Sequence, residues 1–179
     1  CIDLLSLGIA EDLQVEAIKL LIAMLFKEGG AREIQSTMHE YLYNNDSELF
    51  FRQVKATIEK LIMWHKWNEA LRIAEDEDPP FPVEIYLIRM LQLMSEGHYL
   101  PNQDLMRDQP NNLQSINLLE CLVNYFNVIS RIHCRCSTLA GIRVGATIVE
   151  VIQGPCAQNQ EYFASTDILE TSNRIFRRK

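Results

Sequence analysis

The sequence predicts an all-α fold: an armadillo-like helical solenoid or bundle of about nine helices. Apolar residues recur three and four positions apart along most of the 179-residue chain. Only 7 glycines and 6 prolines interrupt it, which leaves long stretches for helices and too few turns for an all-β fold. Helix pairs joined by short connections are typical of bundles and α-solenoids. A single helical domain over residues 1–179 is therefore expected.

Three helices are expected before the first long loop. The first covers Ala17–Phe26 and ends at Gly29–Gly30, which act as a C-cap. The second covers Ala31–Tyr43, and either Asp46 or Ser47 supplies the N-cap of a long third helix. The apolar face of the third helix carries Phe50, Phe51, Val54, Ile58, Leu61, Ile62 and Leu71. The acidic segment 75–82 contains consecutive prolines and is expected to be a loop.

The second half of the chain begins with a helix that is apolar around most of its circumference. It starts at Val83 and ends at Gly97, and this pattern predicts a central, buried helix. A short helix over 102–108 follows, then longer ones over 116–129 and 137–153. Two further helical stretches complete the chain.

Gly141 and Gly145 place two small residues on one face of the 137–153 helix. In a membrane this spacing favours helix dimerisation. Arg143 stands between the glycines and the segment is short for a membrane span. Close packing of a neighbouring helix on this face is therefore the expectation.

Composition excludes several classes of function. The net charge is -7 and the basic residues are dispersed apart from Arg177–Lys179, which argues against nucleic-acid binding. An odd count of 5 cysteines indicates a reducing compartment with free thiols. The apolar run Ala17–Phe26 contains Lys19 and is shorter than the ~20 residues of a membrane span. The chain lacks a basic leader and starts at Cys1, so it is interpreted as a fragment of a longer protein.

Three motifs have a chemical and an ordinary interpretation. His133–Cys136 resembles part of a metal site, but no second ligand pair exists, which favours a helix end with incidental thiols. Trp64–Trp67 could stack on a base or sugar, whereas aromatics at this spacing more often pack in a core. A Cys–His nucleophile pair lacks a strand–turn–helix elbow and an orienting carboxylate. We expect no enzyme activity.

Two acids occupy positions where a carboxylate is unfavourable. Glu96 precedes Gly97 and Glu150 precedes Gly154–Pro155, so each lies at the end of an apolar helix. The unpaired carbonyls and the helix dipole disfavour an acid there by about 0.3–1 kcal/mol. A bound cation reverses that sign, and carboxylate and carbonyl oxygens are the ligands that calcium selects. The alternative is two ordinary surface acids near helix ends.

Several segments resemble a region of the intracellular calcium-release channels, the inositol trisphosphate and ryanodine receptors. The similar stretches are the segment from Leu91 through Glu96–Gly97–His98, Asn102–Arg107, Asn111–Asn112, Glu150–Gln160 and, upstream, Leu20–Phe51. The resemblance is strongest over 83–169 and corresponds to the RIH-associated domain. It implies part of a cytosolic armadillo-like solenoid that links ligand sensing to the transmembrane gate of a tetramer.

The resemblance also implies a site. Glu96 and Glu150 match the two acids that coordinate the activating calcium in this family. His98 and Gln153 match residues that surround these ligands without binding the ion directly. Gly97, Gly154 and Pro155 would form the turns. Gln153 lies three residues after Glu150, so we expect both on one helix face. The family places a further main-chain ligand on a separate part of the channel, so calcium binding by this chain alone is expected to be weak.

The resemblance further implies the partners and the location. The partners would be other domains of the same channel chain and the other subunits of a homotetramer, at the cytosolic face of the endoplasmic or sarcoplasmic reticulum. The inositol trisphosphate branch is preferred because of the run Gly29–Gln35. Met94–Ser95 and Val149 depart from the family's usual residues, and the segment 65–82 has no clear counterpart. The alternative hypothesis is a helical scaffold that binds a protein along a groove and has no ion site.

Overall fold

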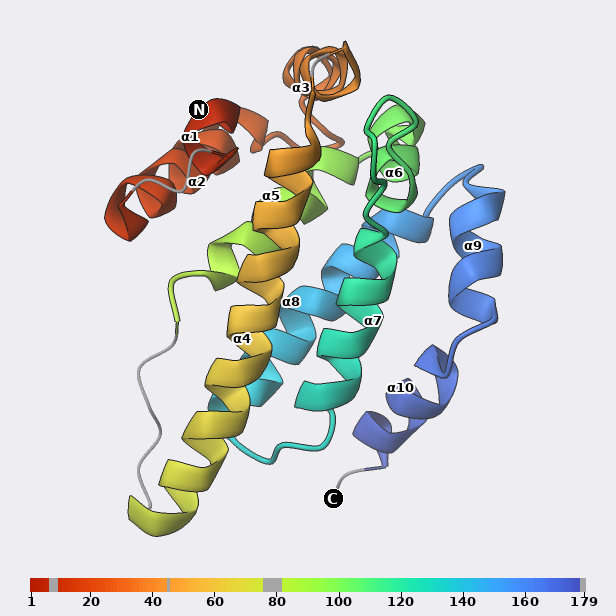
Figure 1. Cartoon of the computed structure of the whole chain (residues 1–179). Coiled ribbons are helices and arrows are strands. Elements are labelled where there is room, and N and C mark those ends of the chain that lie inside the picture. Colours follow the sequence, from red (N-terminus) through yellow and green to blue (C-terminus); the bar gives the residue numbers. More distant parts are fainter. Residues whose placement is uncertain (7–9, 45, 76–81, 178–179) are drawn as a thin grey trace.

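A computed structural model of the chain describes residues 1–6, 10–44, 46–75 and 82–177 (Figure 1). These residues form ten α-helices and no strand, which confirms the all-α prediction. The helices are α1 (Ile2–Ser6), α2 (Glu11–Leu25), α3 (Arg32–Asn44), α4 (Glu48–Glu75), α5 (Ile85–Ser95), α6 (Leu100–Arg107), α7 (Leu118–Ile129), α8 (Arg135–Ile152), α9 (Ala157–Ala164) and α10 (Ile168–Phe176).

Helix α5 is central, as its sequence predicts. It packs against α8 and α2, while α4 packs against α7. Ile88, Met90, Leu91 and Leu93 of α5 are all 0% exposed. Burial of such a continuous apolar surface is the main contribution to the stability of the fold. The helix therefore holds its own C-terminal end at a fixed place in the molecule.

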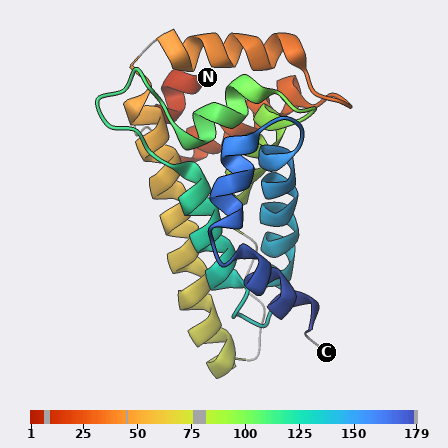
Figure 2. The ribbon, with the colours of Figure 1, turned by 90° about the vertical axis from the view of Figure 1, so that its right-hand side faces the viewer.

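The short helix α6 lies between the C-terminal ends of α5 and α8 and contacts both helices. It contacts α3, α5, α8 and α9. Figure 2 shows α3 lying across the end of the molecule, with α6 beneath it and α4, α7 and α8 running away from both. The C-terminal ends of α5 and α8 therefore reach the same region, although their last residues are far apart in sequence.

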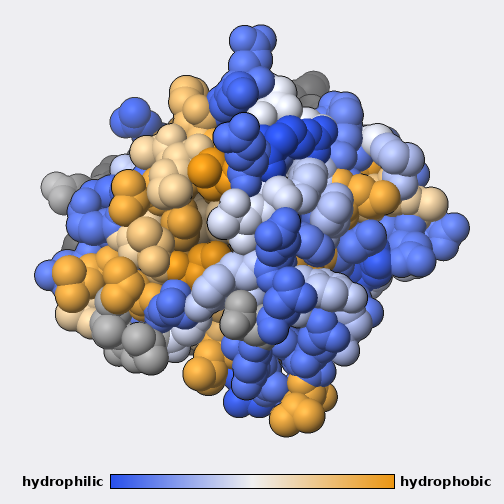
Figure 3. All heavy atoms as spheres, turned by 90° about the horizontal axis from the view of Figure 1, so that it is seen from above, coloured by the Kyte–Doolittle hydropathy of each residue, from blue (hydrophilic) through white to orange (hydrophobic). Residues whose placement is uncertain are grey.

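The apolar face expected for the first predicted helix is only partly correct. Leu21 and Leu25 of α2 are buried, but Leu20 is 51% and Met24 45% exposed. Figure 3 shows the apolar surface that results, at the left where α1 and α2 lie. The helix is apolar on more than one side, and only one side meets the core. The short helix α1 was not predicted, because five residues are too few for a periodic pattern.

The predicted packing of a helix on Gly141 and Gly145 is wrong within the described chain. A Cβ atom built at either glycine would have no heavy atom within 4 Å. Both glycines instead line an open apolar groove of about 600 Å³ between α7, α8 and α10. Apolar side chains elsewhere on α8 already supply its contacts with α5 and α7, so the small residues remain on its outer side.

The ordinary interpretation holds for the candidate metal motif at His133–Cys136. The Sγ atom of Cys134 accepts the backbone N–H of Ser137 in a capping box at the start of α8. None of the five cysteines forms a disulfide.

The aromatic cluster on α4 divides between core and surface. His65 is 1% exposed and lies 3.0 Å from the Tyr125 hydroxyl, and burial lowers its pKa to about 4. Trp67 is 69% exposed.

No helix among the described residues is long and apolar enough to cross a membrane. The sequence pattern assigns Leu71 to the apolar face of α4, but its side chain is not among those that the structure describes.

Candidate cation site

Glu96 is placed by a tight turn after α5. The helix ends at Ser95, and Glu96 is its C-cap with an extended backbone. Gly97 follows with a φ of 71° and His98 with a φ of 62°, so two consecutive residues adopt the left-handed region. A Cβ atom on Gly97 would lie 2.1 Å from the Gly29 carbonyl oxygen, so only glycine fits between the turn and the α2–α3 connection.

Glu150 reaches the same turn from the last turn of α8. The backbone N–H of Gly97, the residue after Glu96, is close enough to the Glu150 carboxylate to act on its pKa. The Glu96 and His98 charges both act on Glu150. The structure therefore brings together the two acids that the sequence analysis singled out, from helices α5 and α8.

The pKa of Glu150 is raised above the ordinary carboxyl value. Burial is the largest cause and the negative charge of Glu96 is the second. The Gly97 N–H, His98 and Arg89 oppose the rise in part.

This pKa direction predicts how stability depends on pH. A carboxyl whose pKa is raised by folding stabilises the native state below its unfolded pKa, and that contribution is lost as pH rises through the folded pKa. We therefore expect Glu150→Gln to become progressively more stable than the parent as pH increases from about 4 to about 7 in calcium-free buffer. Urea unfolding midpoints measure this. The exposed Glu161→Gln is the matched control, and a pH-independent difference for Glu150→Gln would contradict the prediction.

Each acid presents one buried carboxylate oxygen without a hydrogen-bond donor. The Oε2 atoms of Glu96 and Glu150 are both buried and have no hydrogen-bond partner in the structure. Arg89 Nη1 lies 4.0 Å from Glu96 Oε2, beyond hydrogen-bond distance. Buried carboxylate oxygens normally accept hydrogen bonds or coordinate metals. Carboxylate oxygens are the hard donors that a divalent cation such as calcium selects.

The site offers few ligands by itself. Among the described residues, no group of three or more His, Cys, Asp or Glu side chains is arranged to hold a metal ion. Calcium takes about six to eight oxygens, and two carboxylates supply at most about four. Further ligands must be main-chain carbonyls, water or another part of the protein.

Side-chain amides satisfy the carbonyls at the end of α5. Gln35 Nε2 donates to the carbonyl oxygens of Leu93 and Glu96, at 3.0 and 2.8 Å. Asn102 Nδ2 donates to the Met94 carbonyl at 2.9 Å. Both amides are 0% exposed. These donors neutralise part of the negative helix end, which makes the neighbouring carboxylate tolerable.

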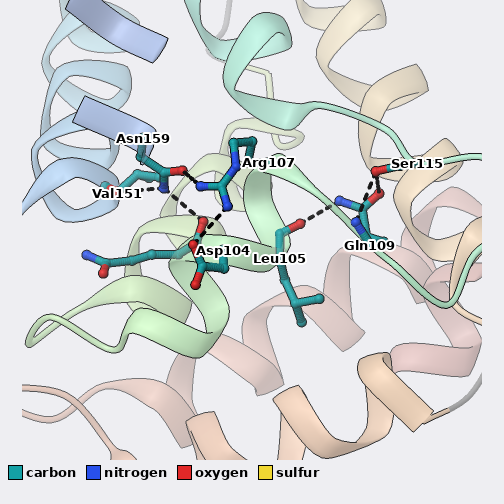
Figure 4. Close-up of polar contacts among 8 residues, drawn as sticks. Asp104, Leu105, Arg107, Gln109, Ser115, Val151 and Asn159 are labelled. Carbon is teal, nitrogen blue, oxygen red and sulfur yellow. Dashed lines mark hydrogen bonds and ion pairs between the residues drawn. The ribbon is translucent and has the colours of Figure 1, made fainter. Parts of the chain in front are cut away.

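A second set of amides serves the end of α8. Gln103 Nε2, which is buried, donates to the carbonyl oxygens of Glu150 and Gln153 at 2.7 and 2.9 Å. Asn159 Nδ2 from α9 donates to Val151 at 3.0 Å, and Arg107 holds the Asn159 side-chain oxygen (Figure 4). Sequence reasoning missed this role. The adjacent amides Asn102 and Gln103 were quoted only as part of a family resemblance.

His98 and Gln153, which the family resemblance places next to the two acids, are both exposed. His98 is exposed, and its Cβ would lie 2.9 Å from a Cβ built on Gly154, whose φ is 81°. Gln153 is exposed and does not share a helix face with Glu150, contrary to expectation, because α8 ends at Ile152 and Gln153 has an extended backbone. Its carbonyl accepts from Gln103 instead. The helix ends at Ile152, and the chain bends at Gly154–Pro155.

A family model describes the same part of the chain. The RyR and IP3R Homology associated family matches residues 82–176, from the residues before α5 to the end of α10. The match covers more than half of the chain and includes both converging acids and the amides of α6 and α9. The family is one of intracellular calcium-release channels, in agreement with the resemblance seen in the sequence. The chain therefore belongs to the RyR and IP3R Homology associated family.

Proposed function

We propose that this chain is a cytosolic regulatory domain of a tetrameric, ligand-gated calcium-release channel and carries part of its activating calcium site. The observation that supports this most directly is the pair of buried, unpartnered carboxylate oxygens of Glu96 and Glu150. Family membership supports the channel context. The ligands on this chain would be Glu96 and Glu150, with His98 and Gln153 close to them.

The physical effect of calcium would be to join two helix ends that otherwise repel. With no ion bound, the Glu96 charge contributes to the raised pKa of Glu150. A divalent cation replaces that repulsion with two attractions. Because α5 and α8 form the centre of the fold, a ligand from a neighbouring channel domain would connect that domain to this core. This supports coupling between ligand sensing and the pore.

Assembly and location are part of the same proposal. Other domains of the channel chain and the other subunits of a homotetramer would contact this domain at the cytosolic face of a calcium-store membrane. The inositol trisphosphate branch remains our preference. The run that motivates it contains three residues that hold the Glu96 turn: Gly30 lies against the Glu96 carbonyl, Arg32 donates to the Gly97 carbonyl, and Gln35 donates to the Glu96 carbonyl.

Calcium titration of the purified chain tests the proposal. We expect weak binding, with a Kd on the order of 10⁻⁴–10⁻³ M, because water must complete the coordination. Glu96→Gln and Glu150→Gln should each abolish the calcium-induced rise in melting temperature, since each removes one anionic ligand. In the intact channel, either change should move calcium activation to higher concentration.

The exposed Glu161→Gln is the matched control, because it changes net charge equally and lies outside the site. It should keep the calcium response of the parent. An unchanged calcium response in both site variants would contradict the proposed site and leave the helical-scaffold hypothesis, for which the groove along α8 is the candidate surface.

A further inference from the structure

Arg89 forms an ion pair with Glu96, one of the two proposed calcium ligands. It lies on α5, seven residues before Glu96, the residue at the C-cap of the helix. Its Nη1 atom is 4.0 Å from Glu96 Oε2, and its charge also acts on Glu150. One guanidinium therefore faces both proposed calcium ligands.

The geometry of Arg89 differs from that of a structural ion pair. At 4.0 Å the guanidinium does not hydrogen-bond Glu96 Oε2, which has no other hydrogen-bond partner. The positive charge therefore offsets the acids without occupying the oxygen that a metal would use. The Arg89 and Glu96 side chains are only 21% and 23% exposed, so water screens the interaction less than at an open surface.

Two neighbours restrict where the guanidinium can go. The Phe26 ring centroid lies 5.8 Å from Arg89 Cζ, within the range of a cation–π contact. On α8, Arg143 is close enough for the two positive charges to repel each other. Movement toward Arg143 is disfavoured, and the charge stays beside the acids.

We infer that Arg89 is a built-in counter-charge that sets the calcium affinity of the Glu96–Glu150 site. The inference rests on the proposed function. Arg89 stabilises the calcium-free site by partly compensating the two carboxylates, and it repels an ion that binds between them. Its presence lowers affinity, so that calcium binds only at the higher concentrations at which a sensor of a calcium signal must respond.

The decisive variant removes the charge and keeps a polar side chain with high helix propensity. We expect Arg89→Gln to tighten calcium binding by roughly ten-fold, because a like charge a few ångströms from a partly buried ion is weakly screened. Arg89→Lys keeps the charge and should bind calcium within about two-fold of the parent. Arg89→Met, an apolar residue with high helix propensity, repeats the neutral test if Gln does not fold. Isothermal titration with calcium measures all three.

A matched control is available on α8. Arg135 is exposed at the first position of that helix, fifteen residues before Glu150, which is roughly 22 Å along the axis. That distance exceeds the Debye length of about 8 Å at physiological ionic strength. Arg135→Gln changes the net charge as Arg89→Gln does and should leave calcium affinity unchanged.

The outcomes separate this inference from the proposed function. Tighter binding in the neutral Arg89 variants alone supports the counter-charge. Unchanged or weaker binding in them overturns it and shows that Arg89 orients Glu96 instead. Equal tightening in Arg89→Lys overturns it as well, because charge would not be the cause. If the parent chain binds no calcium, or binds it independently of Glu96 and Glu150, the proposed function itself fails.

Discussion

Replacing Gly97 with alanine is expected to destabilise the fold by about 3 kcal/mol or more. Two physical effects add. The φ of 71° costs any residue with a Cβ about 1–2 kcal/mol. The new methyl would also lie 2.1 Å from the Gly29 carbonyl oxygen and 2.7 Å from its carbonyl carbon, and both are backbone atoms that cannot rotate away. The turn that carries Glu96 must then separate from the α2–α3 connection. Urea or thermal unfolding followed by circular dichroism measures the loss.

Two other glycines provide matched controls for the same substitution. Gly29 also has a positive φ, 74°, but a Cβ there has no heavy atom within 4 Å, so Gly29→Ala should cost only about 1–2 kcal/mol. Gly141 lies inside α8 in open space, where alanine should stabilise by roughly 0.5–1 kcal/mol. If Gly97→Ala costs no more than Gly29→Ala, the close approach of the two turns is wrong.

Gln103→Leu is the second change for which we expect a large effect, a loss of about 2–5 kcal/mol in the free energy of unfolding. The Gln103 amide is 0% exposed and donates to the carbonyl oxygens of Glu150 and Gln153. Leucine has a similar volume and no donor. Both partly buried carbonyls would lose this donor, and each such loss costs about 1–3 kcal/mol. Chemical unfolding of the parent and variant measures the difference.

Gln160 is a close control because it does the same task at the surface. Its Nε2 donates to the carbonyl oxygens of Ile152 and Gly154 at 2.8 and 2.9 Å, at the same end of α8. It is exposed, so water can replace the lost donor, and Gln160→Leu should cost less than about 1 kcal/mol. Equal losses in the two variants would show that burial of the Gln103 bonds does not matter.

The order and type of most elements could be predicted from the sequence because they depend on local patterns. Apolar spacing located α3 to α5, α7 and α8, while Gly97 and Gly154–Pro155 marked helix ends to within one or two residues. The two acids at those ends also stood out locally, because a carboxylate at a helix C-terminus opposes the dipole. Family resemblance added their expected convergence.

Local patterns could not show which side of an apolar helix would be covered. Leu20 and Met24 belong to the apolar repeat of α2 and are exposed, and the Gly141–Gly145 face has no neighbour within 4 Å. Periodicity records that a surface is apolar, whereas the choice of neighbour depends on how all the helices pack. The sequence interpretation of Gln153 failed for a related reason: the helix ended one residue earlier.

The sequence by itself determined the helical class, the helix ends and the unfavourable positions of Glu96 and Glu150 at those ends. Each of these features depends on residues within a few positions of one another. Only the tertiary structure decided what surrounds those acids. Gln103 bonds a carbonyl 47 residues away, Gln35 one 61 residues away, and Gly97 excludes any side chain because Gly29 lies against it. Arg89 faces both acids because α5 and α8 pack together. Hydrogen bonds and charges act through space, and their partners are known only when the chain is folded.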